Sequence, residues 1–178
     1  MIQLSNFIGH ALGHWSLFAV LMVAASFFYG YGVPRAKSRV FAGSNLKPKL
    51  LDEHLPTWRR HDALTLLEGL GASGRRALQG FYLGMDLWFP GPTICVAYAG
   101  LLSLAFPPGS PLGLLNLLAV PALLFDVAEN VNHLIMARFY PDLSSLSLRM
   151  GPVFTLLKWA FAMAIPVIAL VGFIARQV

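Results

Sequence analysis

Four long apolar stretches, separated by polar and turn-forming residues, dominate the pattern of the chain. They cover about residues 8–31, 81–106, 112–137 and 151–174. A helix needs about 20 consecutive apolar residues to cross a bilayer, and helices satisfy every backbone amide internally where water is absent. The pattern therefore predicts an all-α polytopic membrane protein, in which residues 1–178 form a single membrane domain of four transmembrane helices.

The longest polar interval, about residues 32–80, separates the first two apolar stretches. Its first part, GVPRAKSRVFAGSNLKPK, is basic and rich in Pro, Gly and Ser, so we expect it to lie irregularly along an anionic membrane surface. Its second part, RRHDALTLLEGLG, places Leu64, Leu67 and Leu70 at helical spacing and ends at Gly71. We expect a short cytoplasmic amphipathic helix there, followed by a helix that Ser73 caps at its N-terminus.

The third apolar stretch contains a polar element, FDVAENVNHL. Asp126, Glu129, Asn130 and His133 are spaced i, i+3, i+4 and i+7, so they share one stripe of a helix, whereas Asn132 points elsewhere. A charged side chain in the middle of a membrane helix costs about 2.5–3.5 kcal/mol or more when it faces lipid. We therefore expect this stripe to face the interior of the bundle.

Two further charged residues occur at a similar depth in neighbouring spans. Asp86 and Lys158 each follow about two helical turns after the start of their stretches, which at about 1.5 Å per residue is the level of the polar stripe. Lys158 is thus the expected partner of Asp86, Asp126 or Glu129.

A helix break is expected just after Asp86. Pro90 and Pro92 lack amide donors and crowd the carbonyls four residues earlier, so backbone acceptors would be released beside the acidic side chain. Large aromatic residues near this level would form a wall around a bound molecule: Tyr82, Trp88, Phe89 and Trp159.

Composition and charge indicate a lipid environment and exclude a nucleic-acid partner. The chain is 57% hydrophobic and 12% charged, whereas soluble domains have about 25% charged residues. The net charge of +5 comes from basic residues in the intervals after the first and third stretches, and the PPGSP turn has none. Because basic loops stay in the cytoplasm, we expect both basic loops inside and both termini outside.

The polar stripe allows more than one kind of chemistry. A network of ion pairs and hydrogen bonds would hold the four helices together. A pocket for a lipid or isoprenoid-like molecule would use Asp86, Glu129 or His133 as a general acid or base, for example to isomerise a double bond. The remaining polar residues of the cluster would then bind the ligand: Asp126, Asn130 and Lys158.

Metal or ion chemistry has less support in the sequence. Glu129 and His133 could be ligands, but the helical di-iron pattern needs two Glu-x-x-His motifs, and passage of protons or ions would need an oligomer. His10 and His14 are spaced i, i+4 and could bind haem, chlorophyll or a metal, although next to Trp15 they are more typical of an interfacial anchor. The sequence indicates no particular cofactor.

From about Thr57 onward the chain resembles a widespread family of small four-span bacterial membrane proteins that has no established activity. The resemblance lies in DALTLLEGLGASGRRALQGFYLGMDLWFP, ALLFDVAENVNHLI, YPDL and FTLLKWAF, which occur in this order. It implies a location in the bacterial inner membrane. It also implies one shared site for five residues: Asp86, Asp126, Glu129, Asn130 and Lys158.

Two functions remain open on these grounds. In the first, the protein binds, and in one form of the hypothesis transforms, a hydrophobic ligand from the membrane lipid, which requires a cavity beside Asp86, Glu129 and Lys158. In the second, it is a non-catalytic accessory subunit of a larger membrane complex or a homo-oligomer. That function requires the same groups to be fully paired.

Overall fold

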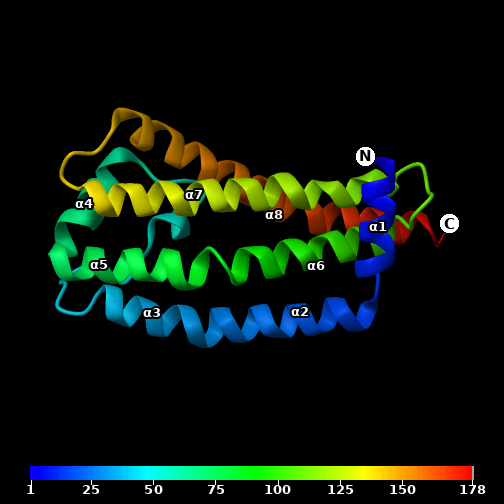
Figure 1. Cartoon of the computed structure of the whole chain (residues 1–178), viewed down its shortest axis with the longest axis horizontal. Helices are drawn as coiled ribbons and strands as arrows, with labels where there is room; N and C mark the ends of the chain where they lie inside the picture. The colour runs from blue at the N-terminus through cyan, green and yellow to red at the C-terminus, as the bar shows by residue number, and fades with distance from the viewer. Residues whose placement is uncertain (178) are drawn as a thin grey trace.

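The structure, a computed structural model, describes residues 1–177 and shows an all-α membrane protein. Within these residues, four helical stretches are long and apolar enough to cross a bilayer: Trp15–Val40, Gly71–Ala105, Gly113–Phe139 and Ser145–Ala175. They run along the long axis of the molecule (Figure 1). The predicted fold class, a polytopic bundle of four membrane helices, is confirmed.

Each span is built from one to three consecutive helical elements. The first contains α2 (Trp15–Phe27), the π-helical turn η1 (Phe28–Gly32) and α3 (Val33–Val40). The second contains α5 (Gly71–Phe81), the π-helical turn η3 (Tyr82–Asp86) and α6 (Pro90–Ala105). The third contains the 3₁₀ element η4 (Gly113–Leu118) and α7 (Ala119–Phe139), and the fourth is α8 (Ser145–Ala175).

Both chain termini lie at one end of the bundle, which we call the terminal end (Figure 1). The opposite end, the loop end, carries α4 (Arg60–Gly69) and the connections that follow α3 and α7. The amphipathic helix predicted after Trp58 is present as α4. Of its predicted apolar face, Leu67 and Leu70 are buried against the bundle, but Leu64 is only half-buried and Leu66 is buried instead. The predicted cap is wrong, because α5 begins at Gly71, and no side chain caps it.

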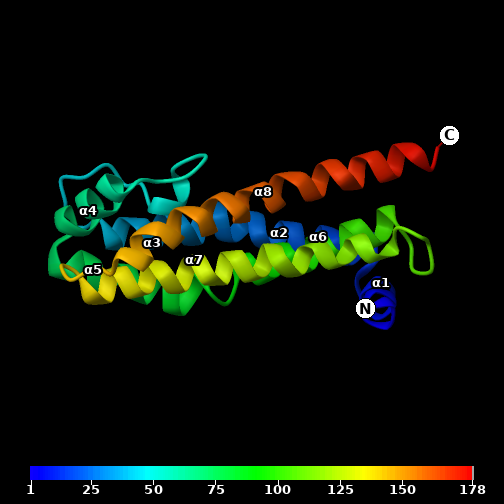
Figure 2. The same ribbon diagram turned by 90° about the horizontal axis from the view of Figure 1, so that it is seen from above.

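The first span differs from the predicted 8–31. The helix is interrupted at Gly13. The residues before it form a separate helix, α1 (Ile2–Leu12), which crosses the terminal end of the bundle (Figures 1 and 2). Ser5 Oγ donates to the carbonyl of Gly113 at 2.9 Å, and the amide of Asn116 donates to the carbonyl of Ser5 at 2.9 Å. With Phe7 and other apolar residues exposed on its other side, α1 has the character of an interfacial helix.

The interval after α3 also differs from the prediction. Residues 33–40 continue the first span as a helix, and residues 50–58, which we call the inserted segment, enter the bundle instead of lying along a membrane surface. Leu50, Leu51 and Trp58 are at most 2% exposed. The burial of these apolar side chains explains the difference, because packing in a core removes them from water.

Two apolar cores stabilise the bundle, one toward each end. The core at the loop end includes Tyr82 of η3 and Met136 of α7, and the core at the terminal end includes Cys95 of α6, Ala122 of α7 and Ile165 of α8. Along α7, the polar stripe lies between Ala122 and Met136. The polar side chains therefore separate the two cores.

Candidate functional site

Ion pairs between α7 and α8 form the centre of the polar cluster. The ammonium group of Lys158 lies 3.4 Å from Asp126 and also pairs with Glu129. Glu129 is 0% exposed, so its charge requires a partner in the protein. The predicted convergence of these three residues in the bundle interior is confirmed.

A hydrogen-bonded chain connects this centre to the inserted segment. The hydroxyl of Thr155 on α8 donates to Glu129, and the indole of Trp58 donates to Thr155 Oγ1 at 3.0 Å. Neither Thr155 nor Trp58 was predicted from the sequence. Thr155 precedes Lys158 by three residues and so lies on the same face of α8, which is a usable signal, whereas Trp58 lies in a loop without helical periodicity.

Asn130 and His133 are buried in the cluster without partners among the described residues. Asn130 is 2% exposed and His133 1%, and neither the amide atoms of Asn130 nor the ring nitrogens of His133 make a hydrogen bond there. The imidazole lies between Trp58 and Tyr82, with ring centroids 5.8 and 5.2 Å away. A buried polar group that lacks a hydrogen bond costs about 1–3 kcal/mol, so these two side chains are expected to meet a partner that the chain itself does not supply.

Asp86 lies at the break in the second span. It ends the π-helical turn η3, and α6 begins four residues later with Pro90 at its first position, where proline removes no helical hydrogen bond. The predicted break is thus confirmed. The charge of Asp86 interacts with those of Asp126, Glu129 and Lys158, yet within residues 1–177 Asp86 forms no ion pair.

Asp52 of the inserted segment adds a fourth carboxylate that was not predicted from the sequence. Its charge acts on Asp86 and on Lys158, and its Oδ1 is buried without a hydrogen-bond partner in the described part of the chain. No periodic pattern surrounds it, so the sequence carries no signal for its position. If all four carboxylates are ionised, Lys158 alone cannot balance them, and the cluster carries a negative charge.

The predicted aromatic wall is only partly present. Tyr82 is buried against His133. Trp159 is turned toward the inserted segment, where its indole donates to the carbonyl of Asp52 at 3.0 Å. Trp88 is 71% exposed on the outer surface, so its placement in the wall is wrong. The turn that separates η3 from α6 explains this, because it rotates Trp88 away from the face that carries Asp86.

Gly91 allows Asp126 to approach the beginning of α6. A Cβ atom at Gly91 would overlap the carboxylate of Asp126. That carboxylate therefore lies beside the N-terminal turn of α6, where the helix dipole favours negative charge.

Gly91→Ala is expected to lower the free energy of unfolding by about 1–3 kcal/mol, because the new methyl group displaces a buried ion pair. Gly80→Ala is the matched control, since a Cβ atom there meets nothing within 4 Å and alanine favours the helix by about 0.5–1 kcal/mol. Unfolding in mixed detergent micelles measures both. Equal stabilities of the two variants would show that Asp126 is not held against Gly91.

His10 lies in the last turn of α1 and His14 is the N-cap of α2, so the two do not share a face of one helix. His14 precedes the first residue of α2, and its Nε2 lies 3.1 Å from the carbonyl oxygen of His10. Both residues line a hollow of about 550 Å³ at the terminal end, together with Trp15 and Arg176. Among residues 1–177, no group of three or more His, Cys, Asp or Glu side chains is arranged to hold a metal ion.

The position of Asn132 distinguishes it from the polar stripe. It is buried, and its amide donates to the carbonyl of Ser147 on α8 at 3.2 Å. It therefore connects α7 to α8 outside the cluster, as its helical angle predicted.

Comparisons with known proteins assign no function to this chain, so its function has to be inferred from the geometry of the site. The chain matches no protein-family model, and searches of curated proteins and of solved structures found no match. The resemblance to small four-span bacterial membrane proteins stays a prediction.

Proposed function

We propose that the protein binds an amphiphilic ligand, a lipid or an isoprenoid-like molecule, with the polar head of the ligand in the cluster around Asn130 and His133. One observation supports this most: two fully buried polar side chains at the middle of the bundle have no partner in the described chain. Native proteins satisfy most such groups with protein, water or ligand. A ligand head would supply both a donor and an acceptor.

The charges of the cluster favour a particular kind of head group. One carboxylate oxygen of Asp126 and one of Asp52 are buried without hydrogen-bond partners among residues 1–177, and both accept hydrogen bonds when ionised. Four carboxyl groups around a single lysine disfavour a phosphate or a carboxylate. A hydroxyl or an amine would fit, because each donates hydrogen bonds, and an amine would also offset the charge.

The same arrangement supports proton transfer on the bound molecule. Asp86 has no ion-pair partner in the described chain, so no cation holds it in the ionised form, and His133 lies in the same cluster. In a double-bond isomerisation, a protonated carboxyl group gives its proton to the alkene carbon farther from the allylic position, and a carboxylate removes a proton from the allylic carbon, so the double bond moves by one carbon. The two transfers balance, and they need no other reactant.

The orientation follows from the basic residues, which are concentrated at the loop end. We place the loop end in the cytoplasm and both termini outside, in the inner membrane of a bacterium, because basic loops are retained on the cytoplasmic side. The ligand head would then lie in the cytoplasmic half of the bilayer.

The paired half of the cluster favours the alternative function, a non-catalytic accessory subunit. One ion pair and two hydrogen bonds connect Lys158, Glu129, Thr155 and Trp58 in a chain. A purely structural role requires such pairing. The two functions differ in what they require of Asn130. A bound ligand would use its free amide, whereas a structural role has no use for a buried side chain without a partner.

Asn130→Leu is expected to remove the bound molecule and to raise the stability of the empty protein. Leucine has nearly the same shape but no polar atoms, so the cost of the unpartnered amide, about 1–3 kcal/mol, is relieved. Asn132→Leu is the matched control: it removes a hydrogen bond to Ser147, so it should lower stability and leave binding unchanged. Organic extraction of the purified protein, followed by mass spectrometry, measures the bound molecule.

If Asn130→Leu lowers stability and no molecule is lost relative to the wild type, the ligand proposal fails. Asp86→Asn separates binding from chemistry. It should keep the bound molecule and abolish its conversion, because an amide does not transfer a proton in this way.

A further inference from the structure

An aromatic groove lies on the outer surface between the first span and η3, apart from the acidic cluster. Its volume is about 450 Å³, within the range of about 300–1,000 Å³ of small-molecule sites. Apolar side chains form most of its wall, among them Phe28, Tyr31, Met85 and Phe89. No charged member of the acidic cluster lines it, so a molecule bound in the groove would be independent of the proposed function.

Two glycines, which have no side chain, leave space in the groove. Gly32 of η1 and Gly84 of η3 both line it. A Cβ atom at Gly84 would meet nothing within 4 Å, so the space beside this residue is open. The two π-helical turns lie on opposite walls, and such turns occur frequently at functional sites.

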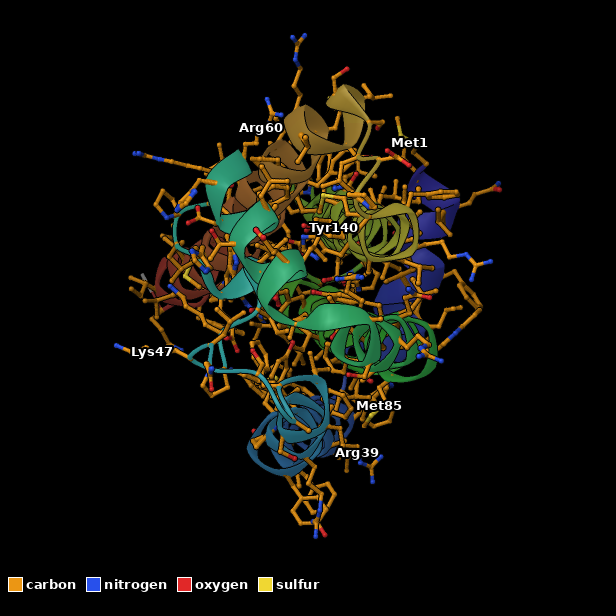
Figure 3. All side chains as sticks on the ribbon, turned by 90° about the vertical axis from the view of Figure 1, so that its left-hand side faces the viewer. Met1, Arg39, Lys47, Arg60, Met85 and Tyr140 are labelled. Atoms are coloured by element: carbon orange, nitrogen blue, oxygen red, sulfur yellow. The ribbon has the colours of Figure 1, made fainter. Side chains whose placement is uncertain are left out.

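Two arginines close the groove at the loop end. Arg35 and Arg39 of α3 both line it, and at a spacing of i, i+4 they lie on one side of the helix. The guanidinium group of Arg35 lies 3.9 Å from the centroid of the Tyr31 ring. Neither arginine forms an ion pair within the described chain. Figure 3 shows Arg39 and Met85 on the same flank of the molecule.

The length of the groove matches one leaflet of a bilayer. Its lining on the first span begins at Phe27 and ends at Arg39, which at about 1.5 Å per residue is about 18 Å. One leaflet contributes about 15 Å of hydrocarbon. The apolar wall thus extends over the depth of an acyl chain, and the arginines lie at the level of the head groups.

We propose that this groove is a binding site for an anionic phospholipid, with the phosphate between Arg35 and Arg39 and one acyl chain along Phe28, Met85 and Phe89. Arginine binds phosphate through two parallel hydrogen bonds, and the membrane supplies the ligand. An anionic head group brings a net negative charge to offset the two arginines, whereas the phosphate of a zwitterionic lipid is already balanced by the lipid's own cation.

Native mass spectrometry tests the site, with the protein in detergent and an equimolar mixture of dioleoyl phosphatidylglycerol and dioleoyl phosphatidylcholine. The wild type should retain phosphatidylglycerol preferentially. Arg35→Gln/Arg39→Gln should weaken phosphatidylglycerol binding by about thirtyfold, since each basic residue near an anionic lipid surface contributes about fivefold. Lys47→Gln/Lys49→Gln removes the same charge from the exposed loop and should change binding less than twofold.

Gly84→Leu tests the apolar half of the groove. The leucine fills the open space without meeting other atoms at its Cβ, so binding should fall at least tenfold with the melting temperature maintained. Gly80→Leu is its control, because it also meets nothing within 4 Å and does not line the groove.

Three results would overturn the proposal. The first is equal loss of phosphatidylglycerol in the Arg35/Arg39 and Lys47/Lys49 variants, which would indicate a general charge effect. The second is full binding by Gly84→Leu. The third is loss of a homodimer in Gly84→Leu with the retained lipid unchanged, which would assign the groove to a second copy of the chain.

Discussion

Lys158→Met is expected to lower the free energy of unfolding by about 3–5 kcal/mol, the cost of leaving buried charge without its partner. Lys158 is the only cation that pairs with Asp126 and Glu129 in the described chain, and Glu129 has no access to solvent. Methionine retains most of the apolar stem, so the loss comes mainly from the charge. Titration with SDS in mixed micelles, followed by circular dichroism, measures the change.

A rescue variant distinguishes lost charge pairing from lost packing. Lys158→Met/Glu129→Gln/Asp126→Asn removes the whole ion cluster, and the new amides can still accept hydrogen bonds, so at least half of the lost stability should return. Replacing a complete buried ion pair is often neutral or stabilising. If the triple variant is no more stable than Lys158→Met, then packing of the lysine stem, and not its charge, holds α8 to α7.

Trp58→Ala is expected to cost about 3–5 kcal/mol, the range for removal of a large aromatic side chain from a core. Trp58 is 1% exposed, packs against His133 and donates to Thr155. It also fills the space beside Gly151, where a Cβ atom would overlap its ring. Its loss should release the inserted segment, so trypsin should cleave after Lys49 more rapidly than in the wild type.

Two controls make the result of Trp58→Ala specific. Trp58→Phe keeps the ring contact and loses only the hydrogen bond, so its cost should be near 1 kcal/mol. Trp88→Ala removes an indole that is 71% exposed and should change stability by less than about 0.5 kcal/mol. Unchanged proteolysis in Trp58→Ala would show that the inserted segment is held by other contacts.

Patterns within a helix predicted the centre of the site. The i, i+3, i+4, i+7 spacing predicted the buried face that carries Glu129, Asn130 and His133. The cost of charge in lipid predicted an acidic partner for Lys158 among Asp86, Asp126 and Glu129, and the last two pair with it. These inferences need only helical geometry and the low polarity of the surroundings. The break after Asp86 followed from the chemistry of proline in the same way.

Features that depend on contacts between distant segments could not be predicted in this way. Asp52 and Trp58 reach the cluster through a segment without periodicity, and only packing against α7 and α8 determines its course. The separation of α1 from α2 depends on hydrogen bonds of Ser5 to residues more than 100 positions away. Trp88 shows the same limit, because a turn of irregular backbone decided which way its indole points.

The inserted segment also has a consequence for how the protein is made. Trp58 is synthesised 97 residues before its hydrogen-bond partner Thr155, which at about 5–20 residues per second means a delay of roughly 5–20 s. During that time the buried side chains of this segment have no fourth helix to pack against. The segment can reach its final position only after the last span has left the ribosome and entered the membrane, so translation that stops before α8 should leave an unfinished product that quality-control proteases recognise.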